Sequence, residues 1–554
     1  MRGITVIVGL VVLAAGANAQ QRPNPLKLAP RPTSAAINAA DLMTRVYIFA
    51  DDSMMGRQTG TVHHDKGTNY IARELARIGL RPGGDSGTYF QRLPIVNRRL
   101  AASSRLIVDG REYLPGRDFL LRDAVDFGMR GRVLDDAPAV YGGVFGEAGG
   151  MISPEQAAGK VVVFTVPRGW QANRGPLTER YIGAAAIIIA TYDAMPAETR
   201  EELSQPSTTM AGVTPGGEVP NYYYASRAVA EAMLGASLAS AAVGTTGKPV
   251  SSRVEYTESP SPGARNVIAI LPGSDPKLRG QYVSIGAHSD HDGVGAAVDH
   301  DSLYAFYHIV RPNGADDGDK QATAEDVPKI AALLDSLRKT RSARRDSIFN
   351  GADDDASGSM GLLEVAEAFA AAREKPRRSI LFIWHVAEEQ GMVGSRYFTD
   401  NPTVPRDSIV ANINIDMIGR GSAADVAGGG PGYLQLIGAR RLSTELGDIV
   451  EAEGRKFTPA FRFDYQFDAN GHPQQFYCRS DHYMYARFGI PVVFMSTGGH
   501  AEYHQVTDEP QYLDYGQLAR VSQLVYNTAK TIADLDHRLI VDQPKPDPNG
   551  RCVQ

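Results

Sequence analysis

Tyr282-Val283-Ser284-Ile285-Gly286-Ala287-His288-Ser289-Asp290 is a short apolar run that ends in a histidine and an aspartate. Three further runs have the length of buried strands, and helical patterns accompany them: strands at 379–384, 409–415 and 491–495, helices at 361–373 and 515–535. This alternation predicts an α/β fold, a mostly parallel mixed sheet flanked by helices on both faces. Ligands bind such sheets at the carboxyl ends of the strands, so the residues after each run are the candidates for chemistry.

Length and composition are those of a globular protein with more than one domain. The chain has 554 residues, of which 43% are hydrophobic and 22% charged. It is too long for one compact core and is not composed like a disordered chain. The net charge of −6 gives no electrostatic reason to expect nucleic acid or an anionic membrane as a partner, and it says nothing of the oligomeric state.

Residues 1–19 have the pattern of a cleaved secretory signal. Arg2 gives a positive start, residues 4–15 are almost wholly apolar, and Ala17-Asn18-Ala19 offers small residues for cleavage. A membrane anchor is the alternative, but the apolar run is shorter than the roughly 20 residues that span a bilayer. We expect an exported protein, periplasmic or secreted, with no stable membrane anchor and a mature chain that starts near Gln20.

Changes in composition divide the rest of the chain. The predicted segments are a flexible lead-in at 20–33, the N-terminal part of the main domain at 34–99, a smaller β-rich inserted domain at 100–260, the rest of the main domain at 261–538 with a surface insertion at 302–349, and a tail at 539–554. The two cysteines, Cys478 and Cys552, exclude a disulfide scaffold. Their spacing does not decide between one bond and two free thiols.

Ionisable residues follow each predicted strand and fill one further loop: His288 and Asp290, Glu388 and Glu389, Asp416, and His504 after the strands, and Asp353, Asp354 and Asp355 in the loop 351–358. Taken singly, each has an ordinary structural explanation, such as a solvated acidic turn. Together they supply two histidines, at least three carboxylates and a spare glutamate, which is the inventory for two zinc ions that share a carboxylate. Cobalt or manganese could substitute, whereas calcium and magnesium are disfavoured by imidazole ligands.

At these positions the sequence resembles the M28 family of zinc metallopeptidases. The matching segments are 286–290, 351–358, 388–391 with 394–395, 414–419 and 504–508, and they occur in the family's order. The resemblance covers about residues 266–533 and a leading segment that starts at 52–57 and ends at 79–82, and it implies the zinc exopeptidase fold. The segment 100–260 resembles the protease-associated (PA) domain that is often inserted in this family.

The resemblance gives each matching residue a role: a bridge between two zinc ions for Asp354, ligands of one zinc for His288 and Asp416, ligands of the other for Glu389 and His504, the general base for Glu388, and orientation of His288 for Asp290. The peptide bond after the bridging aspartate is commonly cis in the family. The implied reaction removes N-terminal residues from peptides with a water held between the metals. Tyr503, His500 and Asp481 are further candidates for substrate contact, with packing as the alternative role.

A second motif complicates the choice of the bridging aspartate. Asn313-Gly314-Ala315-Asp316-Asp317-Gly318-Asp319 is similar to residues 350–355. We choose the later copy because Ala356-Ser357-Gly358 and an apolar helix follow it, whereas Lys320-Gln321-Ala322-Thr323 follows the earlier one. The extra segment is interpreted as a surface insertion near the active-site rim, with a charged helix at about 324–345.

Three other functions are compatible with parts of this pattern. A carboxypeptidase of the same family would use the same metals, since the side chains that meet the substrate terminus cannot be identified from sequence. Glutaminyl cyclases share the fold but typically use one zinc. Receptor-like relatives are binding modules that have lost ligands, and no ligand position is lost here. The preference for an aminopeptidase therefore rests on the frequency of that activity in the family.

Overall fold

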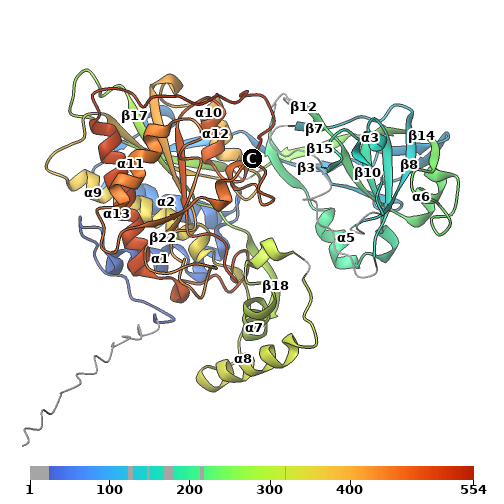
Figure 1. Cartoon of the computed structure of the whole chain (residues 1–554), viewed down its shortest axis with the longest axis horizontal. Coiled ribbons are helices and arrows are strands. Elements are labelled where there is room, and N and C mark those ends of the chain that lie inside the picture. The colour runs from blue at the N-terminus through green and yellow to red at the C-terminus, as the bar shows by residue number, and fades with distance from the viewer. Residues whose placement is uncertain are drawn as a thin grey trace, which may run out of the picture.

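The computed structural model describes residues 24–122, 129–145, 150–167, 180–211, 217–261, 263–318 and 320–554. The predicted signal at 1–19 and residues 20–23 of the lead-in lie outside this part of the chain. Figure 1 shows a larger lobe, a smaller lobe beside it, and an arm that projects from the larger lobe.

The larger lobe is built on a mixed sheet. Its strands are β1 (Arg81–Pro82), β2 (Phe90–Leu93), β16 (Ala264–Leu271), β17 (Tyr282–His288), β20 (Ser379–His385), β21 (Ile409–Ile415), β22 (Tyr433–Ile437), β23 (Arg462–Asp464) and β24 (Val492–Ser496). They lie in the order β1-β16-β20-β17-β21-β24-β22-β23, with β2 also paired to β16. The central strands β20, β17, β21 and β24 run parallel, and β16 and β22 flank them antiparallel. The predicted mostly parallel mixed sheet is confirmed, and the carboxyl ends of its central strands share one edge.

Helices cover both faces of this sheet because the central strands are apolar on both sides. In β20, Ile380, Phe382 and Trp384 pack into one core cluster, and Leu381 and Ile383 pack into another. The first cluster contains residues of α1 (Ala39–Phe49), α2 (Val62–Arg77), α9 (Gly358–Ala371), α11 (Thr444–Gly454) and α13 (Tyr515–Asp534), and the second contains residues of α10 (Val393–Asp400) and α12 (His482–Ala486). The sheet is thus the middle of three layers.

The smaller lobe is built on a second sheet, between residues 105 and 253. Its order is β5-β4-β14-β8-β9-β10-β13-β6. The bounds are β4 (Arg105–Val108), β5 (Arg111–Tyr113), β6 (Phe119–Arg122), β8 (Ala137–Val144), β9 (Val161–Thr165), β10 (Ala186–Ala190), β13 (Asn221–Ala225) and β14 (Thr246–Arg253), with helices α3 (Pro154–Ala157), α5 (Ala197–Leu203) and α6 (Arg227–Leu234). Two small sheets accompany it, β11-β3-β15 and β12-β7, formed by β3 (Ile95–Leu100), β7 (Met129–Gly131), β11 (Ser207–Met210), β12 (Gly217–Val219) and β15 (Tyr256–Pro260).

The arm is a hairpin with helices in its connection. It consists of β18 (Gly293–Asp299), α7 (His300–Val310), the short 3₁₀ helix η4 (Gly314–Asp317), α8 (Asp326–Thr340) and β19 (Arg345–Phe349). The predicted insertion at 302–349 begins too late, because β19 pairs antiparallel with β18 from Gly293 onward. The base of the hairpin packs on Gly56, where a Cβ atom would lie 2.3 Å from the Gly293 carbonyl oxygen. No residue of α8 is buried.

The C-terminal tail is fastened to the larger lobe. Cys478 and Cys552 form a disulfide, which settles the pairing that their spacing left open. The side chain of Gln554 donates to the carbonyl oxygens of Phe467 and Ala469 at 3.2 and 3.1 Å. Within the described part of the chain, no helix combines the length and the apolar character needed to cross a bilayer.

His482, in α12, is a buried imidazole in apolar surroundings. Its ring stacks on Phe494 with centroids 4.9 Å apart and lies 5.6 Å from the ring of Tyr477. Neither ring nitrogen has a hydrogen-bond partner among the described residues. Burial lowers the pKa of His482 to about 3.

We expect His482→Phe to make the folded state less sensitive to acid. The unfolded chain binds a proton on this histidine below its ordinary pKa of 6.5, whereas the folded chain does so only near pH 3. The histidine therefore costs stability progressively as the pH falls from 6.5 towards 3, by up to about 1.4 kcal/mol per pH unit. Urea unfolding at a series of pH values should show a shallower loss of stability in the variant, and an unchanged slope would contradict this account.

Candidate metal centre and active site

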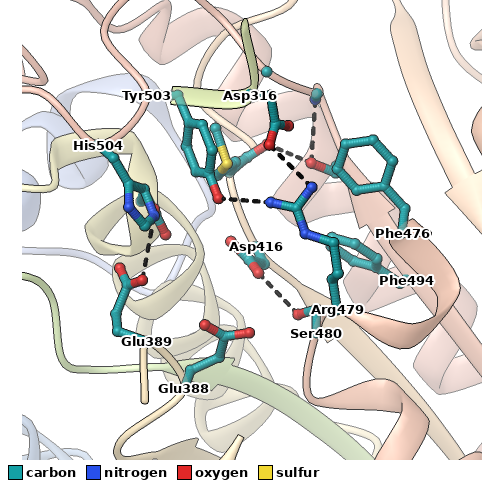
Figure 2. A pocket seen from close by; sticks show the side chains of 15 residues that line it. Asp316, Glu388, Glu389, Asp416, Phe476, Arg479, Ser480, Phe494, Tyr503 and His504 are labelled. Atoms are coloured by element: carbon teal, nitrogen blue, oxygen red, sulfur yellow. Dashed lines mark hydrogen bonds and ion pairs between the residues drawn. The ribbon is translucent and has the colours of Figure 1, made fainter. Parts of the chain in front are cut away.

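The carboxyl ends of the central strands and two loops meet at one pocket (Figure 2). The pocket is lined by most of the residues predicted to bind metal or catalyse: Asp354, Glu388, Glu389, Asp416 and His504. His288, the last residue of β17, lies just beneath the lining and is 1% exposed. Parallel strands bring these residues together, because Glu388 and Asp416 follow strands that pair directly with β17.

Asp354 offers its two carboxylate oxygens to two histidines. Its Oδ1 lies 3.0 Å from His288 Nε2, and its Oδ2 lies 3.0 Å from His504 Nε2. Asp416 Oδ1 lies 3.6 Å from His288 Nε2, and Glu389 Oε2 lies 3.2 Å from His504 Nε2. The structure therefore places two donor groups side by side, each with one histidine and one carboxylate, and Asp354 belongs to both.

The neighbours of Asp354 face the backbone and not the pocket. Asp353 Oδ1 accepts the Gly419 N–H at 2.7 Å, and the Asp355 carboxylate accepts three backbone N–H groups at distances of 2.8, 3.1 and 3.2 Å. The Asp508 carboxylate in turn accepts the Asp354 N–H at 3.1 Å. The Asp354–Asp355 peptide bond is cis, as the family resemblance implied.

Arg57 joins the acidic loop to the loop after β17. The side chain is fully buried and donates to the carbonyl oxygens of Asn350, Gly351 and Ser289 at 2.6, 3.0 and 3.3 Å. Hydrogen bonds from a charged donor are the stronger kind, so this one side chain fixes the spacing of two loops that carry site residues. This contact explains why the leading segment of the chain accompanies the metal-binding motifs.

The donor atoms fit a zinc centre. Three groups have all their ligand atoms within 4.8 Å of one another: His288, Asp354 and Glu389; His288, Asp355 and Asp416; and Asp292, Glu389 and His504. Asp416 Oδ1 is buried and has no hydrogen-bond partner among the described residues, a lack that a cation would satisfy. Imidazole nitrogens and carboxylate oxygens are ordinary zinc ligands.

Crowding also shifts ionisation in the pocket. Burial would raise the pKa of Asp354, but hydrogen bonds with His288 and His504 outweigh it and hold the pKa well below its ordinary value. Burial raises the pKa of Glu388 well above its ordinary value, and the charge of Glu389 adds to this effect. The pKa values of two carboxylates in one pocket are thus shifted in opposite directions.

Two residues near the pocket, His291 and Asp292, were not predicted from the sequence. His291 Nδ1 lies 2.6 Å from Glu389 Oε1, and Asp292 Oδ2 lies 3.2 Å from His504 Nδ1. Since His504 Nε2 faces Asp354, Asp292 holds the ring from its opposite side, as partners of metal-binding histidines commonly do. The signal was present in the sequence, because the polar run after β17 continues beyond Asp290 to Asp292.

We expect Asp292→Asn to weaken zinc binding about 10- to 100-fold, because a neutral amide orients and polarises the imidazole of His504 less well. Competition with a chelator at fixed zinc concentration measures the change. Asp335→Asn, at an exposed position of α8, makes the same charge change away from the pocket and should bind zinc normally. Wild-type affinity in Asp292→Asn would contradict the positioning role.

Asp290 meets His288 through its backbone. Its carbonyl oxygen lies 3.2 Å from His288 Nδ1, whereas the Asp290 carboxylate is 3.9 Å away. The carboxylate instead accepts the Glu388 N–H at 3.3 Å and the Thr59 hydroxyl at 3.2 Å. The carboxylate is within ion-pair range of the imidazole, but the backbone carbonyl makes the shorter contact, so the orienting role of Asp290 stays a prediction. β17 ends at His288, so the alternation of side chains along a strand no longer applies two residues later.

The three candidates for substrate contact have different outcomes. Tyr503 lines the pocket. His500 and Asp481 are buried behind its wall, where His500 Nε2 lies 3.3 Å from Asp353 and Asp481 lies 3.2 Å from His385. Contact of these two residues with substrate is therefore not supported. Their position along the chain did not give the direction of their side chains.

Comparison with known proteins identifies the region that carries this site. Residues 266–529 match peptidase family M28. Leupeptin-inactivating enzyme 1 of Streptomyces exfoliatus is 28% identical over 169 residues, which are 30% of this chain and 33% of that protein. A probable leucine aminopeptidase of Arthroderma benhamiae is 25% identical over 191 residues, 33% of this chain and 48% of that protein. The chain thus spans less than half the length of these curated relatives.

Solved structures of similar proteins include two bacterial aminopeptidases. The aminopeptidase from Aneurinibacillus sp. strain AM-1 has a TM-score of 0.47 and 16% identity, with 92% of this chain and 97% of that chain covered. A zinc aminopeptidase from Bacillus subtilis has a TM-score of 0.46 and 16% identity, with coverage of 90% and 95%. The match over residues 266–529 is the finding that identifies the region carrying the site: this region matches peptidase family M28.

Proposed function

We propose that this protein is a zinc-dependent aminopeptidase that removes N-terminal residues from peptides. The observation that carries the proposal is the position of Asp354 between two histidines, with one further carboxylate beside each histidine. That arrangement suits two metal ions that share one carboxylate, and the carboxylate of Glu388 lines the same pocket.

The proposed ligands follow from the two donor groups. His288 and Asp416 would hold one zinc, Glu389 and His504 the other, and Asp354 would contact both. Bound zinc would supply a water of lowered pKa and would polarise the carbonyl group of the substrate.

Glu388 is the proposed general base. Among the described residues its carboxylate has no hydrogen-bond or ion-pair partner, so it is free to take a proton from water and pass it to the departing amine. Burial raises the pKa of Glu388 well above its ordinary value, which makes its carboxylate a stronger base. The Asp290 carboxylate accepts the Glu388 N–H and so holds the base in place.

The direction of cleavage is proposed from the charges in the pocket. A carboxypeptidase needs a cation that is free to bind the carboxylate of its substrate. Within the described part of the chain, Arg479 is the one arginine or lysine that lines the pocket, and it is paired with Asp316 at 3.0 Å. This pairing favours substrates that present an amine. The names of the leucine aminopeptidase relatives agree with that direction.

The other proposals concern the whole chain. We propose that residues 1–19 direct export and that residues 100–260 are a PA-like domain. N-terminal sequencing of protein recovered outside the cytoplasm should start near Gln20, and an intact Met1 would contradict cleavage. The cyclase and receptor-like functions are disfavoured because the sequence has a histidine or a carboxylate at each proposed ligand position.

Product mass spectrometry tests the proposed activity. Zinc-loaded protein is given free and N-acetylated versions of the same peptides, some of which begin with glutamine. Stepwise loss of N-terminal residues from the free peptides alone, abolished by a chelator, is the expected result. C-terminal trimming or ring closure of glutamine would move the assignment to a carboxypeptidase or a cyclase. No change in any peptide would contradict a peptidase.

A further inference from the structure

The motif that resembles the bridging loop also reaches the pocket. Residues 313–318 form the turn around η4 in the arm, and Asp319 lies outside the described residues. The Ala315 N–H donates to the Tyr503 carbonyl oxygen at 3.1 Å. Gly314 has a φ of 61°, and a Cβ there would lie 2.6 Å from the same oxygen. The arm is therefore seated directly on the loop that carries His504.

The two adjacent aspartates of this motif do different things. Asp317 stays within the turn, where its carboxylate accepts the Asn313 N–H at 2.9 Å and pairs with Lys320. Asp316 turns into the pocket and lies 3.0 Å from Arg479, as Figure 2 shows. The side-chain contacts within the turn are thus made by Asp317, and the Asp316 side chain is available for a role in the pocket.

Arg479 is held at the pocket from two sides. Besides Asp316, its guanidinium donates to the Tyr503 hydroxyl at 3.2 Å and lies 5.2 Å from the centre of the Phe476 ring. The Arg479 side chain is 35% exposed and that of Asp316 is 13% exposed. The guanidinium therefore remains within reach of a ligand, while the partner that neutralises it is nearly covered.

We propose that Asp316 occupies Arg479 and thereby makes the pocket discriminate against ligands that bring a free carboxylate. The inference rests on the proposed aminopeptidase function and concerns its choice of substrate: longer or amidated peptides over dipeptides, and weak retention of free amino acid products. A guanidinium binds carboxylates through paired hydrogen bonds. A ligand carboxylate must therefore compete with Asp316 for donors and also meets its negative charge.

A matched pair of substrates tests the proposal, leucyl-glycine and leucyl-glycinamide, which differ only in the terminal carboxylate. The zinc-loaded wild-type chain should have a higher KM for the acid than for the amide. Asp316→Asn keeps an oxygen that accepts from Arg479 but removes the charge, so the ratio of the two KM values should fall about tenfold. The double variant Asp316→Asn/Arg479→Gln should lose this gain. Asp335→Asn, on the exposed α8 of the same arm, should keep the wild-type ratio.

Direct binding separates this inference from the proposed function. Calorimetric titration of the zinc-loaded chain with leucine and with leucinamide measures the same discrimination without turnover. Tighter leucine binding by Asp316→Asn supports the role of Asp316 even if no peptide is cleaved, in which case only the proposed function fails. An unchanged ratio and unchanged leucine affinity in Asp316→Asn, or a gain that survives loss of Arg479, would overturn the inference.

Discussion

Glu388→Gln is expected to retain zinc at close to the wild-type level while kcat falls roughly 100- to 10,000-fold, the range typical of a lost general base. Glutamine has nearly the same shape as glutamate, so the pocket should stay intact. It cannot accept a proton at neutral pH, and the proposed transfer from water to the leaving amine loses its carrier. Steady-state kinetics on a peptide substrate and metal analysis of the same preparation measure the two effects together.

The combination of the two readouts makes this variant informative. A fully active Glu388→Gln protein would remove Glu388 from the role of base. Joint loss of zinc and activity would instead make Glu388 a ligand, a role proposed for its neighbour Glu389. Glu374→Gln, at an exposed position just after α9, is the matched control and should change neither quantity.

The central sheet was predictable because its strands are apolar on both faces. A strand covered by helices on both sides reads as a continuous apolar run, and such runs at 379–384 and 409–415 correspond to β20 and β21. The residues that follow such strands gather at one edge for a topological reason, so the convergence of Glu388 and Asp416 needed no knowledge of loop geometry.

Directions of side chains in loops were not predictable. His500 and Asp481 lie beside pocket residues in sequence, yet the imidazole of His500 pairs with Asp353 and the carboxylate of Asp481 pairs with His385. Strand alternation and helix periodicity relate sequence to direction only inside regular elements. The partners of His504 escaped for the same reason, since Asp292 reaches it from a loop more than two hundred residues earlier in the chain.

The repeated aspartate motif shows a different limit. In the sequence, either copy could supply the bridging carboxylate. The apolar helix that follows the later copy favoured Asp354. The structure brings both copies to the pocket, Asp354 beside the histidines and Asp316 beside Arg479. Sequence similarity made the two copies alternatives for one role. In the structure they occupy different positions in the same pocket, because the arm folds back onto the loop of Tyr503.

Asp354→Asn is expected to lose metal from both sites and to lower activity at least about a thousandfold, since bound metal is worth several kcal/mol to such reactions. The reason is geometric: each oxygen of Asp354 faces a different histidine at 3.0 Å. The asparagine amide is neutral and offers one acceptor oxygen. Both groups of ligands therefore lose the negative charge that Asp354 supplies to them. Elemental analysis after gel filtration should find about two zinc ions in the wild-type chain and none in the variant.

Comparison with Asp416→Asn sharpens this test, because Asp416 belongs to one donor group and its loss should remove only one zinc. Retention of two zinc ions by Asp354→Asn would contradict the bridge.

Thermal unfolding gives an independent measure. Removing zinc from the wild-type chain leaves several buried carboxylates to repel one another, so a chelator should lower its melting temperature. Asp354→Asn holds no zinc to lose and lacks one of these charges, so its melting temperature should respond little to the chelator.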